Sequence, residues 1–199
     1  MASGASSERY LPSTVRKPVK ILVVGAFGVG KTTLIGSVSE IVPLRTEEAM
    51  TAVSAGVDDL AGLAGKTTTT VAMDFGRITI GREVVLYLFG APGQRRFWGL
   101  WDGLADGAVG ALVLVDTRRL ENSFEVLDQL EVYKQGLPFA VVVNRFPDTL
   151  HHGRDELRLA LDLLPETPIV HCDARDRRSS LDALITLTEH SLSRTYEAP

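Results

Sequence analysis

A glycine-rich run near the amino terminus carries the clearest chemical pattern in this sequence. It matches G-x-x-x-x-G-K-[ST] in full and lies between an apolar segment that predicts a strand and a segment that predicts a helix. Glycines let backbone N–H groups converge on phosphate oxygens, and the following helix adds partial positive charge. The predicted phosphate-binding residues are Gly25, Ala26, Phe27, Gly28, Val29, Gly30, Lys31, Thr32 and Thr33.

Two side chains of this run predict specific roles. Lys31 is placed to reach the terminal phosphates of a nucleotide, and Thr32 offers a hydroxyl to Mg²⁺. The alternative is a glycine-rich turn with a solvated lysine, which would leave the complete motif unexplained.

Alternating strands and helices must position this loop. Apolar runs predict strands at 19–24, 71–80, 83–89, 109–115, 139–143 and 168–171, and helical patterns lie between most of them. The runs on either side of Gly81-Arg82 have so short a link that they must pair antiparallel. This order predicts an α/β domain with about six strands, mostly parallel, one of them antiparallel, and helices on both faces.

Composition places the chain among ordinary soluble domains. It has 199 residues, 45% hydrophobic and 23% charged, with a net charge of −4 and one cysteine. These values favour neither a disulfide scaffold nor a nucleic-acid-binding surface, and no segment is long and apolar enough for a membrane anchor. We expect a flexible tail at 1–17, one domain at 18–199, a cytoplasmic location, and membrane association only through partners.

The order of motifs over about residues 19–194 resembles the Ras-like small GTPases. The runs KTTTTVAMDF, LYLFGAPGQRRFW and VDTRRL are most similar to the bacterial MglA-related type, and within it to the actinobacterial conservon GTPases. This resemblance implies a P-loop NTPase fold, bound GTP or GDP, Mg²⁺, slow hydrolysis, and a switch read by partners that include roadblock-type proteins.

The resemblance implies residues for two switch segments. Thr70, four residues before Asp74-Phe75, takes the place of the threonine that reaches Mg²⁺, although its neighbouring threonines compete for that role. In Gly90-Ala91-Pro92-Gly93-Gln94, Gly93 takes the place whose amide meets the γ-phosphate, and Gln94 the place that orients water. Gly90 replaces the usual aspartate, which puts metal affinity and intrinsic rate in question. The implied catalytic set is Lys31, Gly93 and Gln94.

The base-reading motifs depart from the family pattern. Asn144 and Arg145 fit the first two positions of N-K-x-D, but Pro147 occupies the aspartate position and Asp148 follows one residue late. Either Asp148 still reaches the base or discrimination of guanine is weakened. A second base loop is implied at Asp173, Ala174 and Arg175, with the Ala174 amide on the guanine oxygen.

Two other readings remain. A non-hydrolysing nucleotide-binding module would explain the missing carboxylate at Gly90. A P-loop ATPase would need Asp116, at the end of an apolar run, as the metal-associated carboxylate. Arg45, Arg95 and Arg96 are unranked candidates for a catalytic arginine.

Overall fold

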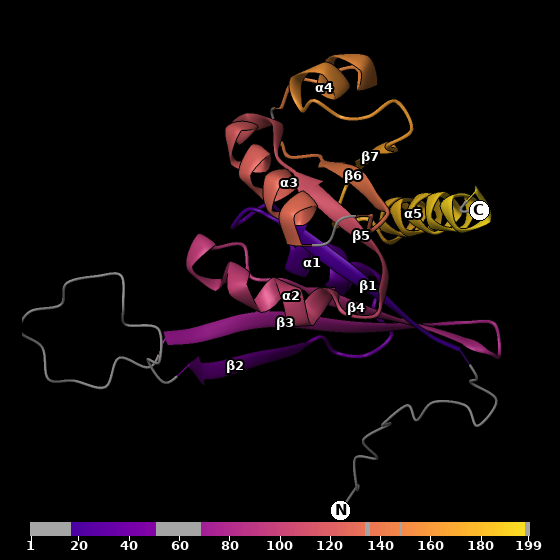
Figure 1. Cartoon of the computed structure of the whole chain (residues 1–199). Coiled ribbons are helices and arrows are strands. Elements are labelled where there is room, and N and C mark those ends of the chain that lie inside the picture. Colours follow the sequence, from indigo (N-terminus) through magenta and orange to yellow (C-terminus); the bar gives the residue numbers. More distant parts are fainter. Residues whose placement is uncertain (1–16, 51–68, 134–135, 148, 198–199) are drawn as a thin grey trace, which may run out of the picture.

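The chain folds around one sheet, with helices packed on both of its faces (Figure 1). The structure, a computed structural model, describes residues 17–50, 69–133, 136–147 and 149–197. Within these residues the sheet has seven strands in the order β2-β3-β4-β1-β5-β6-β7. The strands are β1 (Lys17–Gly25), β2 (Leu44–Met50), β3 (Thr69–Ile80), β4 (Val84–Gly90), β5 (Ala108–Val115), β6 (Phe139–Asn144) and β7 (Ile169–Cys172).

The helices follow the predicted alternation. They are α1 (Lys31–Val38), α2 (Trp101–Ala105), α3 (Glu121–Tyr133), α4 (Arg154–Ala160) and α5 (Arg177–Glu197), with two 3₁₀ segments, η1 (Arg95–Leu100) and η2 (Thr117–Arg119). The expected tail lies outside the described residues, apart from Lys17, which already belongs to β1.

One strand runs against all the others. β3 pairs antiparallel with both β2 and β4, whereas β1, β4, β5, β6 and β7 pair in parallel. The prediction of a mostly parallel sheet with one antiparallel strand is therefore confirmed. The predicted number of about six strands was one too few, because β2 carries charged and small residues without the apolar run that marks the others.

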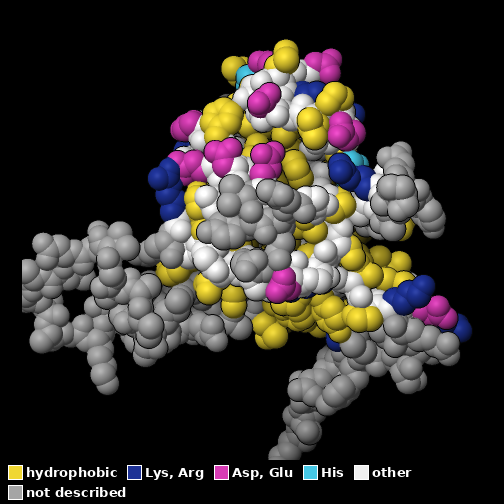
Figure 2. All heavy atoms as spheres, viewed as in Figure 1, with side chains coloured by type: hydrophobic (Ala, Val, Ile, Leu, Met, Phe, Trp, Pro, Cys, Tyr) yellow, Lys and Arg dark blue, Asp and Glu magenta, His cyan; other side chains and the backbone are white. Residues whose placement is uncertain are grey.

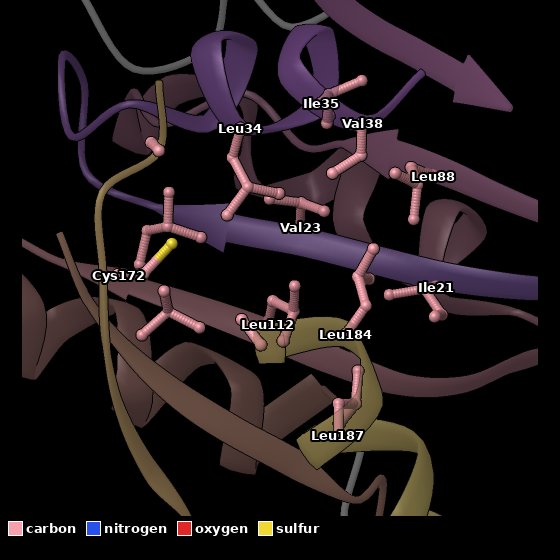
Figure 3. Packing of buried hydrophobic residues seen from close by; sticks show 14 of the residues in the cluster. Ile21, Val23, Leu34, Ile35, Val38, Leu88, Leu112, Cys172, Leu184 and Leu187 are labelled. Atoms are coloured by element: carbon pink, nitrogen blue, oxygen red, sulfur yellow. The ribbon is translucent and has the colours of Figure 1, made fainter. Parts of the chain in front are cut away.

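Side chains alternate between two cores along each central strand. In β1, Ile21 and Val23 pack with α1 and α5, and Figure 3 shows them among Leu34, Ile35, Leu184 and Leu187. Leu22 and Val24 point to the other face, where α2, α3 and α4 pack. A central strand buried on both faces explains why its sequence is a continuous apolar run.

The surface differs from this interior. Figure 2 shows acidic side chains along the face that carries α3, whose exposed carboxylates include Glu121, Asp128 and Glu131. Among the described helices, none is both long enough and apolar enough to cross a membrane.

Candidate nucleotide-binding site

The glycine-rich run forms a loop that joins the end of β1 to the start of α1. Gly28 and Gly30 have φ angles of +79° and +108°, which residues other than glycine rarely adopt. A Cβ on Gly30 would lie 2.5 Å from the Asn144 side-chain nitrogen, so this position also lacks space. These constraints explain the glycines and leave a curled backbone at a helix N-terminus, which is the geometry that binds phosphate.

The Lys31 side chain folds back onto the start of this loop. Its ammonium donates hydrogen bonds to the carbonyls of Gly25 at 2.8 Å and Ala26 at 2.9 Å. Burial lowers the pKa of Lys31 to about 8, against an opposing effect from the charge of Asp74. This ammonium is largely withdrawn from water, is bonded to carbonyls and has one carboxylate nearby. Binding of an anion is therefore favourable, because it compensates the buried positive charge.

Thr32 contacts a carboxylate that the sequence comparison did not assign. Its hydroxyl donates a hydrogen bond to Asp74 Oδ2, from the antiparallel strand β3. Asp74 lies in register with Gly90 of β4, the position where the family resemblance led us to expect an aspartate. The neighbouring strand therefore supplies a carboxylate beside the loop threonine.

The hydroxyl of Thr32 and the carboxylate of Asp74 fit a magnesium ion. Mg²⁺ prefers hard oxygen ligands and binds in nucleotide sites through one or two protein oxygens together with phosphates and water. Thr32 or Asp74 would hold the ion directly or through its water, and a bound ion would neutralise charge on the phosphates.

Gly93 lies directly against the phosphate loop. A Cβ on this residue would meet the Gly25 oxygen, the Ala26 carbonyl carbon and the Lys31 nitrogen, each at 2.7 Å. Gln94 follows, partly buried, and its carbonyl accepts a hydrogen bond from Phe97 at the start of η1. The segment is anchored further on by Trp101, whose indole donates to the Pro92 carbonyl at 3.1 Å.

Asn144 ties the phosphate loop to the loop after β7. Its side-chain amide donates to the Val29 carbonyl at 2.9 Å, and its oxygen accepts the Ala174 N–H at 3.0 Å. Asn144 is buried, so both hydrogen bonds are shielded from water. The Ala174 N–H, which we expected to face guanine, is bonded to Asn144 in this structure.

The remaining base-loop residues lie near this amide. The Arg145 N–H donates to the Cys172 carbonyl at 2.7 Å, which joins the ends of β6 and β7. Asp173 accepts two hydrogen bonds from the Arg175 side chain, and these bonds lower the pKa of Asp173 to about 2. Asp148 lies outside the described residues.

The structure describes the backbone of Thr70 but not its side chain. Its backbone belongs to β3, in register with Ala49 of β2, and four residues of strand place it about 13 Å from Asp74. Asp74, and not Thr70, lies next to Thr32 along β3. The expected reach of Thr70 to Mg²⁺ stays a prediction.

Asp116 has other partners than the phosphate loop. Its carboxylate accepts two hydrogen bonds from the Arg118 side chain, at 2.9 and 2.7 Å. Asp74, not Asp116, is thus the carboxylate at Thr32, which contradicts the metal-associated role that the ATPase reading required. Of the three arginine candidates, Arg95 pairs with Glu125 of α3, and the side chains of Arg45 and Arg96 lie outside those described.

The loop, its lysine and the order of strands define a P-loop nucleotide-binding protein with a GTPase-like fold. The chain belongs to the family described as conserved hypothetical ATP-binding proteins, whose model matches residues 23–194. An uncharacterized protein of Methanocaldococcus jannaschii is 29% identical over 129 residues, which is 64% of this chain and 70% of that protein.

A solved structure has a similar fold. The G domain of the T. maritima FeoB iron transporter superposes with a TM-score of 0.56 at 18% identity, over 88% of this chain and 98% of that domain. At this identity the likeness concerns the fold.

Proposed function

We propose that this protein binds GTP with Mg²⁺, hydrolyses it slowly to GDP, and acts as a molecular switch. The observation that carries the proposal is the pairing of Thr32 with Asp74 beside Lys31, because it supplies the carboxylate that Gly90 lacks. Gly93, where an added Cβ would lie 2.7 Å from the same lysine nitrogen, supports a role in sensing the terminal phosphate.

The proposed chemistry consists mainly of positioning and charge stabilisation. Lys31 and the loop amides stabilise the phosphates, and Gln94 orients the attacking water. A roadblock-type regulator is proposed from the family resemblance alone. Replacing Gln94 with leucine should slow hydrolysis and leave nucleotide affinity unchanged; equal turnover would remove Gln94 from the mechanism.

The choice of guanine is the part of the proposal most open to test. Asn144 supports it, because this buried amide joins the phosphate loop to the second base loop. Pro147 in place of the base-reading aspartate favours the second candidate, an ATP-binding protein, in agreement with the description of the family.

Titration of GDP, GTP, ADP and ATP, each with and without Mg²⁺, separates these candidates. Preference for guanine by about 100-fold or more supports the switch, because a site built to bond a polar edge rejects the wrong base strongly. Equal affinity for ATP would contradict it. A time course of bound GTP with no conversion over many hours would instead identify a non-hydrolysing module.

A further inference from the structure

Two adjacent arginines follow β5, and one buried carboxylate holds both. Asp116, 4% exposed, accepts hydrogen bonds from the Arg118 backbone at 3.0 Å and from the Arg118 guanidinium. Arg119 Nη2 lies 3.7 Å from the same carboxylate. Burial alone would raise the pKa of Asp116, but the bonds from Arg118 and both positive charges lower it below its ordinary value. Asp116 therefore stays ionised and orients two cations.

The two guanidinium groups have different neighbours. Arg118 lies over the ring of Phe146, 3.7 Å from its centroid, in the loop that carries the first base-reading motif. Arg119 extends to the phosphate loop, where its Nη2 is 3.6 Å from the position of a Cβ on Gly28. One carboxylate thus connects the base loop and the phosphate loop through a pair of arginines.

Among the ion pairs of the described residues, this cluster has more positive than negative charge. Two guanidinium groups share one carboxylate, and the shorter contacts to it belong to Arg118, at 2.7 and 2.9 Å. Arg119 keeps about half of its side chain exposed, at 49%. The loop offers backbone amides and the Lys31 ammonium to a nucleotide, and a further positive charge at Gly28 adds to their attraction for phosphate.

We infer that Arg119 strengthens binding of the nucleotide's phosphate chain by placing a positive charge against Gly28, with Asp116 as the residue that positions it. This inference rests on the proposed nucleotide-binding function and deepens it. Arg119 acts through its charge and comes from η2, which distinguishes it from Lys31 of the loop sequence itself.

The test compares variants that keep or remove the charge at this position. Affinities for GDP and for ADP are measured from about 50 to about 300 mM KCl for the wild type, Arg119→Lys and Arg119→Met. Arg194→Met is the matched control: Arg194 is an exposed residue of α5, and 17 residues of helix separate it from the start of α5, about 25 Å away. Thermal unfolding of each variant checks that the fold is retained.

We expect Arg119→Met to weaken nucleotide binding about 5- to 20-fold at low salt and to reduce its dependence on salt. Arg119→Lys should stay within about threefold of the wild type, because the charge remains. Equal affinity of the methionine variant and the wild type would overturn the inference, as would a lysine variant as weak as the methionine one. Failure of the wild type to bind either nucleotide would instead overturn the proposed function.

Discussion

At the scale of single residues, the pairing of Thr32 with Asp74 decides how the site is interpreted. Gly90, at the end of β4, stands where the sequence pattern leads one to expect an aspartate, and read alone it suggests a weakened metal site. Asp74 brings a carboxylate to Thr32 from the adjacent strand, so the same pair of oxygen ligands is available.

Removing this carboxylate should weaken the dependence of nucleotide binding on magnesium. Asp74→Asn keeps the size of the side chain and removes its charge, and we expect about a 10- to 100-fold loss of Mg²⁺ affinity in the presence of GDP. The measurement is nucleotide affinity over a Mg²⁺ titration. Asp128→Asn, on the exposed face of α3, is the control; equal loss in both variants would argue against a local role for Asp74.

Lys31 should take up a proton when a nucleotide binds. Its pKa is lowered to about 8 by burial, and a bound polyanion favours the charged form and so raises that pKa. Below pH 8 the free protein already carries the proton. Affinity should therefore be highest there and fall as the pH rises above 8.

Calorimetry in buffers of different ionisation enthalpy measures this proton directly. At pH 8 about half a proton per nucleotide should be taken up, and at pH 6.5 almost none from this lysine. Uptake that is the same at both pH values would show that Lys31 is not the group that titrates.

At the scale of elements, the β3–β4 hairpin shows what sequence could and could not predict. The two strands and their antiparallel pairing followed from apolar runs with a short link. Their register depends on the length of the turn: a two-residue link pairs Asp74 with Phe89, whereas the observed pairing of Ile80 with Val84 sets Asp74 opposite Gly90. Because the turn is one residue longer than a two-residue link, the sequence did not indicate that Asp74 lies opposite Gly90.

Two other features were not predicted, for different physical reasons. The apolar pattern that revealed most strands is absent from β2, which lies at the edge of the sheet. The sequence also did not indicate a role for Arg119, because only folding brings this residue to Gly28, which lies 91 positions earlier in the sequence. The phosphate loop was predictable because motif, strand and helix are contiguous there.

The segment after β4 should depend on the small size of Gly93. Gly93→Ala places a methyl group 2.7 Å from loop backbone and from the Lys31 nitrogen, so the segment must move away. We expect weaker binding of GTP, about tenfold or more, with a smaller effect on GDP, because the proposed contact is to the terminal phosphate.

Gly99→Ala in η1 is the matched control, since apart from its chain neighbours no atom of the described residues lies within 4 Å of the added Cβ. Competition binding of GTP and GDP gives the comparison. Equal losses for the two nucleotides would show that Gly93 does not distinguish them.

At the scale of the whole molecule, the site is assembled from loops that are distant in sequence. Asn144 at the end of β6 joins Val29, 115 positions before it, to Ala174, 30 positions after it. These hydrogen bonds link the loop after β1 to the loop after β7, so the site and the fold share the same contacts.

Asn144→Ala should therefore lower both the stability of the fold and the affinity for nucleotide. It leaves a buried carbonyl and a buried N–H without this partner, and we expect a loss of about 2 kcal/mol or more in the free energy of unfolding. Denaturant unfolding measures this loss, with Asn122→Ala on the exposed side of α3 as control. Unchanged stability would mean that the amide is not a structural link.

The close contact between Gly90 and Asp74 has a consequence for lineages of related chains. A Cβ on Gly90 would come within 3.0 Å of both Asp74 Cβ and Ile35 Cδ1, so the two positions cannot both carry a large side chain without rearrangement. In related chains, an acidic residue at one of these two positions should therefore occur together with a small residue at the other. A search that looks for the acidic residue only in β4 would classify such chains as having lost it, although the carboxylate is supplied by β3 instead.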